Sequence, residues 1–256
     1  MKIYTKESLI AEITDICDRG WLLNARQGNA GGIGNTLEDL LGINENNIPL
    51  PNASEWELKC QRIGSTSLVT LFHMEPSPRG LRFVPNVFLP LYGWEHQSID
   101  GELSFRQTIH GKSASDRGFR VVLDRESKKV LVSFNATDVD KRHKSWIRTV
   151  RRRVGLGELN PQPYWGFDDL MHKAGTKLIN CFYIRAEVNR KSGKEYFQYK
   201  NILICETFDF EKFLGAIEDG IVLVDFDART HHNHGTKFRM RQDKLPLLYK
   251  KVTVIR

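Results

Sequence analysis

The segment PNASEWELKC (51–60) constrains the fold most, because apolar and charged residues alternate along it. Side chains of an extended strand point in turn to opposite faces, so Glu57 and Lys59 are expected to project together while Trp56 and Leu58 point the other way. A carboxylate beside an ammonium group can hold a divalent metal and polarise a phosphate or a water molecule. The same spacing also occurs on solvated strand faces, so by itself it leaves both interpretations open.

Helical and strand-like patterns are mixed along the 256 residues. The segments predicted to be helical are 6–19, 36–41, about 138–154 and 210–220, and the predicted strands are about 54–60, 66–73, 119–124, 129–134, 176–188, 196–208 and 221–230. The segment 76–118 is rich in Pro, Gly and polar residues and has little periodicity. This order, with its several hairpins, predicts an α/β fold with a mixed central sheet flanked by helices.

Composition narrows the class of protein. The hydrophobic content of 40% fits a globular chain that buries one large core or two lobes sharing one. No apolar stretch is long enough to cross a bilayer, and the first residues lack the apolar region of a signal peptide. The four cysteines are scattered without a C-x-x-C pair. We therefore expect a cytoplasmic protein with reduced thiols and no membrane contact.

Positive charge is concentrated in one segment. The net charge is +7, and residues 141–153 carry seven Lys and Arg residues without an acidic residue. Such a local excess favours a polyanionic partner. The alternative is the solvated face of an amphipathic helix, because Trp146, Ile147 and Val150 recur at helical spacing within the same segment. One helix can satisfy both interpretations.

A glycine-rich loop (28–34) precedes the first candidate acidic residue. The loop lacks the G-K-[S/T] ending of a P-loop and does not follow a strand, so it does not predict nucleotide binding. Thr36 is a plausible N-cap for the helix that follows, which would place Glu38 in its first turn. Carboxylates are favoured there by the helix dipole alone.

The segment THHNHGTKFRMR (230–241) combines three histidines with Lys237, Arg239 and Arg241. A zinc site is disfavoured, because no cysteine lies nearby and the histidines are too close together for the usual ligand spacing. The second interpretation is a loop that reads DNA, since Arg and Lys donate to guanine N7 and O6 in the major groove. The third is a polar loop whose hydrogen bonds are satisfied within the protein.

Four blocks of sequence resemble the MvaI/BcnI restriction endonucleases, which are relatives of the MutH mismatch-repair nickase. They are GNAGGIGNTLEDLL (28–41), EWELK with STSLVTLF (55–72), PYWGFDDL (163–170) and HNHGTKFR (232–239). The resemblance implies a restriction-endonuclease-like (MutH-like) fold of the PD-(D/E)xK superfamily. Its expected form is two lobes around a DNA cleft, with a catalytic lobe of about 1–75 plus parts of 115–205 and a DNA-recognition lobe of about 206–256 with 76–115.

The resemblance also assigns candidate catalytic residues. Glu38 matches the helical acidic residue of the family, Glu57 the second metal-binding acid and Lys59 the catalytic lysine. The first metal-binding aspartate of the family falls on Asn52, which keeps a carbonyl oxygen but loses a negative charge. An engineered Asp→Asn inactivation is the favoured explanation; a natural loss of activity, or a substitute ligand such as Glu55, are the alternatives.

The resemblance predicts a type II restriction endonuclease that cleaves a short GC-rich double-stranded DNA site with Mg²⁺, as a monomer and without an obligatory protein partner. A cognate DNA methyltransferase is expected in the host. The alternatives are a catalytically silent, sequence-specific DNA-binding protein and a MutH-like repair nickase. A Mg²⁺-dependent cleavage test separates the first two.

Specificity is expected to come from two different parts of the chain, because a monomer has no second subunit to read the other half of a nearly symmetric site. The candidate base-contacting residues are Arg229, His232, His234, Lys237 and Arg239 of the C-terminal segment, with His73 reaching the centre of the site from the other side. Candidate phosphate contacts are Arg148, Arg151 and Arg152. A histidine at position 73 is typical of the CC(C/G)GG-cutting (BcnI) branch of the family, which predicts that site over CC(A/T)GG.

Overall fold

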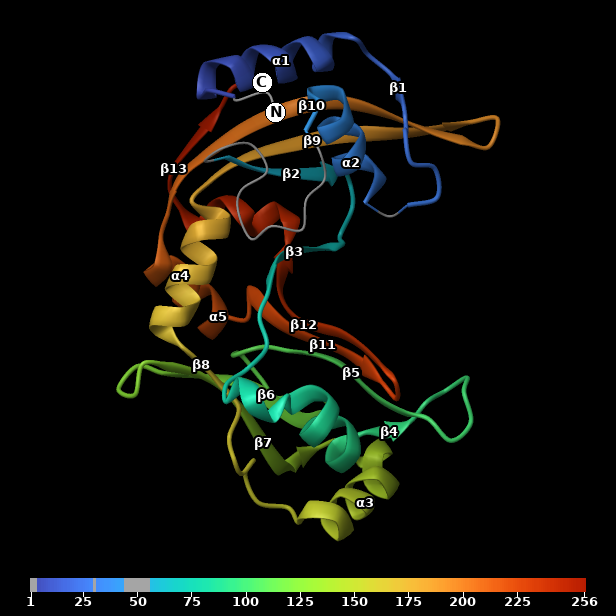
Figure 1. Cartoon of the computed structure of the whole chain (residues 1–256), viewed down its shortest axis with the longest axis vertical. Helices are drawn as coiled ribbons and strands as arrows, with labels where there is room; N and C mark the ends of the chain where they lie inside the picture. Colours follow the sequence, from blue (N-terminus) through green and yellow to red (C-terminus); the bar gives the residue numbers. More distant parts are fainter. Residues whose placement is uncertain (1–3, 30, 44–55) are drawn as a thin grey trace. The chain divides into compact units, whose positions relative to one another are not determined.

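The computed structural model describes residues 4–29, 31–43 and 56–256. The chain forms two compact units, Met1–Ser67 with Ala174–Asp209 and Pro246–Arg256, and Leu68–Lys173 with Phe210–Leu245. The segments α4 (Phe167–Leu178) and η4 (Gln242–Leu248) run from one unit into the other. Figure 1 shows the course of the chain through both units.

The first unit is built on a mixed sheet. Its elements are α1 (Lys6–Asp18), β1 (Leu22–Leu23), α2 (Gly32–Leu41), β2 (Trp56–Arg62), β9 (Asn180–Lys191), β10 (Lys194–Phe208) and β13 (Tyr249–Val254). The strand order is β1-β10-β9-β2, with β13 also paired to β10. β2 runs parallel to β9, and the other pairs are antiparallel. Helices α1 and α2 cover the sheet with apolar side chains, among them Leu9, Ile13 and Leu37, which pack against Phe182 and Tyr199.

The second unit contains two antiparallel sheets. Its elements are β3 (Leu68–His73), η1 (Arg79–Leu81), η2 (Val84–Tyr92), β4 (Trp94–Glu95), β5 (Leu103–Ile109), β6 (Arg117–Asp124), β7 (Lys129–Val139), η3 (Lys141–His143), α3 (Lys144–Val154), β8 (Tyr164–Gly166), α5 (Phe210–Glu218), β11 (Val222–Arg229) and β12 (His232–Arg241). The strand orders are β3-β12-β11-β5-β4 and β6-β7-β8.

An aromatic cluster joins the layers of the second unit. Phe88 of η2 lies with its ring centroid 4.8 Å from Phe105 of β5, 5.3 Å from Phe226 of β11 and 6.0 Å from Phe119 of β6. The segment η2 is thus the apolar layer between one face of the five-stranded sheet and the β6–β7 hairpin. The other face of that sheet carries the polar residues described below.

Several elements agree with the sequence patterns. Helices α1 and α5, the hairpins β6–β7 and β9–β10, and strand β11 all form where they were predicted. The expectation of one central sheet was wrong, because the strands divide among three sheets. The segment 76–118 contains the unpredicted elements η2, β4 and β5. The helix predicted for 138–154 begins as a helical turn at Lys141, because β7 continues to Val139.

Two further predictions are corrected by the structure. Helix α2 begins at Gly32, so Thr36 lies inside it and is no N-cap. The Thr36 side chain is buried, and its Oγ1 accepts a hydrogen bond from the backbone N–H of Ala25. The expected lobe 206–256 is divided as well, because β13 pairs with β10 in the first unit.

Candidate functional site

Glu57 and Lys59 lie on one face of β2, as the alternation of the sequence predicted. Trp56 and Leu58 point into the apolar core under α1 and α2. On the opposite face, Lys59 Nζ donates to Glu57 Oε1 at 2.5 Å. The Glu57 side chain is only 2% exposed. Burying a carboxylate without a partner costs free energy of folding. The ion pair with Lys59 offsets this cost for Glu57.

A third charged group belongs to the same cluster. Lys177, in the last turn of α4, places Nζ 3.0 Å from Glu57 Oε2. Sequence reasoning missed this residue. The parallel pairing of Glu57 with Cys181 brings the start of β9, and the helix that precedes it, beside β2. Only this pairing, which the sequence pattern does not specify, reveals Lys177.

The balance of charge keeps Lys59 protonated. Burial by itself lowers the pKa of the Lys59 ammonium group, but the neighbouring Glu57 carboxylate raises it by its charge and its hydrogen bond. The net result is a pKa above the ordinary value for lysine. Glu38, on α2, adds a smaller contribution in the same direction. The Glu38 carboxylate therefore interacts electrostatically with Lys59. Glu38 lies late in α2 and not, as the sequence predicted, in its first turn.

The remaining predicted ligand, Asn52, and the alternative Glu55 lie outside the described residues. Within the residues that are described, no group of three or more His, Cys, Asp or Glu side chains is placed to hold a metal ion. Glu57 does fit a Mg²⁺ site, because Mg²⁺ prefers carboxylate oxygens and is often held by only one or two of them with water and substrate phosphates. The histidines of 231–234 form no metal centre of the described chain.

The polar face of the β5–β11–β12 sheet is the second cluster of functional side chains. Residues of β11 alternate between buried and partly exposed positions, and Asp225 and Asp227 are on the partly exposed side. Asp225 accepts from Arg239 at 3.0 Å and from Thr108 at 2.8 Å. Asp227 lies 3.2 Å from the ammonium nitrogen of Lys237. These aspartates were not predicted, although the alternation of VLVDFDAR indicates their common face.

The histidine-rich segment is the tip of a hairpin. In the β11–β12 register Arg229 lies opposite His232, so both project on the polar face that carries Asp227. Arg229 also pairs with Glu102 at 2.7 Å. The rings of His232 and His234 lie 4.8 Å apart. The candidate residues of the C-terminal segment thus come together along one hairpin, named here the hairpin face: Arg229, His232, His234, Lys237 and Arg239 with Asp225 and Asp227.

His73 lies beside this hairpin. It ends β3 and pairs with Lys237 of β12, so it belongs to the same sheet and does not come from a separate loop. The His73 side chain is exposed at the end of β3, but the partial loss of solvent around its imidazole is the main cause that lowers its pKa below the ordinary value, and the positive charge of Lys237 adds to it. The ring is therefore neutral at pH 7, with one donor and one acceptor nitrogen.

The basic helix α3 lies elsewhere in the second unit. Trp146 Nε1 donates to the carbonyl of Tyr92 at 2.8 Å, which fixes α3 against η2. Because the five-stranded sheet packs on η2 as well, this apolar layer lies between α3 and the hairpin face, and Figure 1 shows α3 at the lower end of the unit with the β11–β12 hairpin above it. The structure therefore does not bring Arg148, Arg151 and Arg152 together with the base-contacting candidates.

The chain matches the model of the MvaI/BcnI restriction endonuclease family over residues 10–249. The chain belongs to the MvaI/BcnI restriction endonuclease family. Membership gives a DNA-cleaving hydrolase.

Two solved structures are similar over the whole chain. One is the complex of restriction endonuclease MvaI with cognate DNA, with 27% identity, a TM-score of 0.78 and coverage of 99% of this chain and 100% of that one. The other is MvaI in the absence of DNA, with 25% identity, a TM-score of 0.57 and full coverage of both chains. No curated protein sequence matches the chain. In the described residues no helix is long and apolar enough to cross a membrane.

Proposed function

We propose that this chain is a type II restriction endonuclease that binds CC(C/G)GG as a monomer and hydrolyses phosphodiester bonds with Mg²⁺. The observation that carries the proposal is the Glu57–Lys59 pair, buried on one strand of a family member, with Lys177 beside it. Its sequence carries Asn52 where the family pattern has an aspartate, so this form is proposed to bind its site and to cleave slowly. The similar MvaI was crystallised with cognate DNA, which supports double-stranded DNA as the substrate.

The chemistry of each residue of the β2 cluster (Glu57, Lys59 and Glu38) assigns it a role in the proposed reaction. Glu57, with the side chain of residue 52, would hold the metal ion. When bound, Mg²⁺ would supply Lewis-acid chemistry at the scissile phosphate. Lys59, which stays protonated beside Glu57, would orient the attacking water and stabilise the negative charge that develops on the phosphate. Glu38, whose charge makes a smaller contribution to the raised pKa of Lys59, would position Lys59 or a metal-bound water.

The hairpin face is proposed to read the bases. Arg239 and Lys237 can donate to guanine, while Asp225 and Asp227 can accept from the amino group of cytosine. Because each cation is already hydrogen-bonded or paired with a carboxylate, the side chains are held in place before DNA arrives. His73, next to Lys237, is proposed to contact the central base pair. Its neutral ring can meet guanine N7 or O6, whereas thymine would present a methyl group.

The second candidate is a catalytically silent protein that binds the same DNA. One observation favours it, namely the loss of a carboxylate at position 52. A third candidate, a repair nickase similar to MutH, is less well supported, because dense base readout is of little use to an enzyme directed by partner proteins. Cleavage of plasmid DNA separates the first two candidates.

The deciding experiment compares the unmodified chain with Asn52→Asp on plasmid DNA in the presence of Mg²⁺. The substitution restores a negative charge to a site for a dication, so the cleavage rate should rise by several orders of magnitude. Asn52→Asp combined with Glu57→Gln is the matched control and should be inactive. Fast cleavage by the Asn52 form would contradict the proposal and make Glu55 a ligand.

A second experiment tests the metal site without cleavage. Mn²⁺ binding to the Asn52→Asp protein can be followed by electron paramagnetic resonance. Replacing Lys177 with Met removes a cation 3.0 Å from Glu57, so Mn²⁺ should bind severalfold more tightly. Glu57→Gln should abolish binding. Weaker binding to Lys177→Met would mean that Lys177 instead positions the Glu57 carboxylate for the metal.

A further inference from the structure

The cations of α3 differ from those of the hairpin face in having few acidic partners. Arg142 and His143, just before the helix, pair with Asp116 at 3.3 and 2.8 Å. In the described chain, none of the other basic residues of 141–153 lies within ion-pair distance of a carboxylate. They are Lys141, Lys144, Arg148, Arg151, Arg152 and Arg153. All six are exposed.

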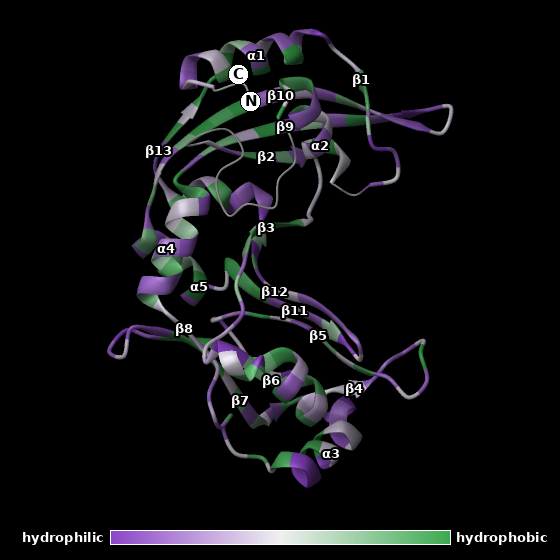
Figure 2. Ribbon diagram, viewed as in Figure 1, coloured by the Kyte–Doolittle hydropathy of each residue, from purple (hydrophilic) through white to green (hydrophobic). Residues whose placement is uncertain are grey.

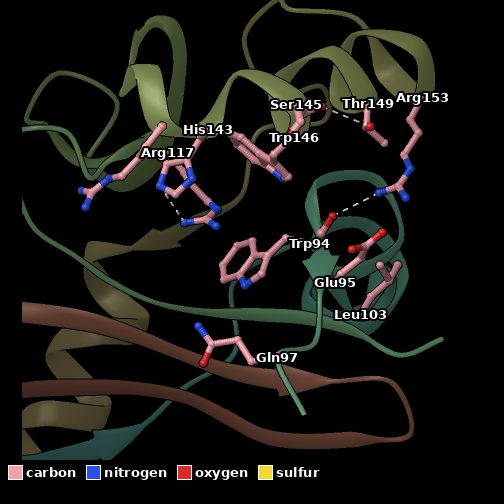
Figure 3. A pocket seen from close by; sticks show the side chains of 12 residues that line it. Trp94, Glu95, Gln97, Leu103, Arg117, His143, Ser145, Trp146, Thr149 and Arg153 are labelled. Atoms are coloured by element: carbon pink, nitrogen blue, oxygen red, sulfur yellow. Dashed lines mark hydrogen bonds between the residues drawn. The ribbon is translucent and has the colours of Figure 1, made fainter. Parts of the chain in front are cut away.

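A pocket of about 400 Å³ continues this surface (Figure 3). Arg117 lies there between two tryptophans, with its guanidinium carbon 3.9 Å from the ring centroid of Trp94 and 5.4 Å from that of Trp146. Its buried Nε has no hydrogen-bond partner. Arg153, on the opposite wall, donates to the carbonyl of Gly93 at 3.1 Å. Stacking therefore fixes a cation at the edge of the α3 surface, where its guanidinium also lies 3.7 Å from the Asp116 carboxylate.

The other polar groups of the pocket suit an anion. The hydroxyls of Ser145 and Thr149 line it from the first two turns of α3, and Arg142 lines it from η3. Glu95 is the one acidic residue of the lining and is exposed. Arg117 and Arg142 share the Asp116 carboxylate at 3.7 and 3.3 Å, so three arginines against Asp116 and Glu95 leave the pocket weakly positive. The larger positive charge is the exposed row of α3 cations beside the pocket, which matches the phosphates of a nucleic-acid backbone.

The position of α3 decides which DNA this surface can meet. The apolar layer of η2 separates the helix from the hairpin face within the same unit. We propose that the α3 surface and its pocket form a second, sequence-independent binding site for duplex DNA, so that the protein holds a second duplex segment while the hairpin face holds the recognition site. The inference rests on the proposed function only in taking duplex DNA as the substrate.

The test uses two labelled duplexes without divalent metal: a short one with the CC(C/G)GG site and a long one without it. Saturation of the full chain with the short duplex should leave its affinity for the long duplex within about twofold, because the two sites are separate. Replacing Arg148, Arg151 and Arg152 with Gln should weaken long-duplex binding at least about tenfold. The matched control, Lys191→Gln with Lys194→Gln and Lys250→Gln, removes the same charge from exposed positions of the first unit and should change it far less.

A second variant guards against a loss of folding. Ser145→Glu places a carboxylate at the pocket in the first turn of α3, where the helix dipole favours it, so the melting temperature should not fall. Long-duplex binding should fall severalfold. The inference is overturned if the short duplex displaces the long one, or if the α3 variant and its control lose the same affinity. If the short duplex does not bind, the proposed site specificity fails, and the α3 variant against its control still decides the inference.

Discussion

The hairpin face and α3 both carry several cations, but they compensate that charge in opposite ways. On the hairpin face, Arg239 pairs with Asp225 and Lys237 with Asp227 at 3.0 and 3.2 Å. The exposed cations of α3 differ. Arg148, for example, has no carboxylate of the described residues within ion-pair distance. Figure 2 shows hydrophilic stretches in both regions, so hydropathy alone does not tell them apart.

In the proposed function, the difference corresponds to two ways of binding DNA. Paired side chains are held in fixed positions, and fixed donors and acceptors can distinguish one base edge from another. Unpaired cations attract any phosphate backbone, and their contribution falls with salt. The comparison therefore predicts that specificity lies in the hairpin face and general affinity in α3.

The largest effect is expected from Arg239→Ala. The substitution removes a base contact and leaves the Asp225 carboxylate, 13% exposed, without its guanidinium partner. Binding to the cognate duplex should weaken by about 1–3 kcal/mol, roughly 5- to 150-fold. Fluorescence anisotropy with a cognate duplex measures it. Arg239→Lys keeps the charge but not the fork-shaped donor, so an unchanged affinity in that control would show that only charge matters.

The next effect concerns salt. Neutralising Arg148, Arg151 and Arg152 removes up to three phosphate contacts, so the slope of log K against log salt should become less steep by roughly 2 to 3. Binding to a long duplex without the site, measured over a salt series, provides the slope. An unchanged slope would mean that α3 makes no phosphate contacts and is only the solvated face of an amphipathic helix.

A smaller effect is expected from substitution of His73, which lies beside Lys237 of the hairpin face. His73→Ala should abolish the preference for C·G over A·T at the centre of the site, measured by competition between the two duplexes. His73→Gln keeps one donor and one acceptor and should retain part of it. Equal affinity of the unmodified protein for both duplexes would defeat the proposed site.

The smallest effect is a shift in the titration of the His73 imidazole. Its pKa should lie below 6.5, because the partial loss of solvent and the nearby charges of Lys237, Lys173 and Arg239 disfavour the charged form. The Glu75 carboxylate opposes them, so Glu75→Gln should lower the pKa further. The stability that the neutral ring contributes is present above pH 6.5 and is lost as the pH falls through the lowered value. An NMR titration of the His73 ring measures both values; a pKa above 6.5 contradicts this environment.

Local patterns predicted the single elements well and their assembly poorly. Alternation in β2 was enough to place Glu57 and Lys59 together, and helical spacing was enough for α1 and α5. The pairing between strands that are distant in the sequence could not be predicted from local patterns. The parallel contact of β2 with β9 brings Lys177 beside the Glu57–Lys59 pair, and β13 pairs with β10, which is distant in the sequence.

The same limit applies to the DNA-binding candidates. The run of positive charge at 141–153 was evident in the sequence. Its separation from the hairpin depends on the helical segment η2 (Val84–Tyr92), which could not be predicted because this stretch contains proline. His73 was expected to reach the centre of the DNA site from the side opposite the C-terminal segment, and instead it lies beside Lys237 in the same sheet. Composition predicts candidate residues for binding a polyanion, whereas only the sheet register shows which of these candidates lie together.

The most direct test of the division between the two regions is the ratio of cognate to non-cognate affinity, measured at one salt concentration for three proteins. These are the unmodified chain, Arg239→Ala, and the variant with Arg148, Arg151 and Arg152 replaced by Gln. The ratio should fall in Arg239→Ala and rise severalfold in the α3 variant, because the lost phosphate contacts carry no sequence information and belong to a site separate from the hairpin face. A ratio that falls equally in both would show that the two regions bind DNA as one surface.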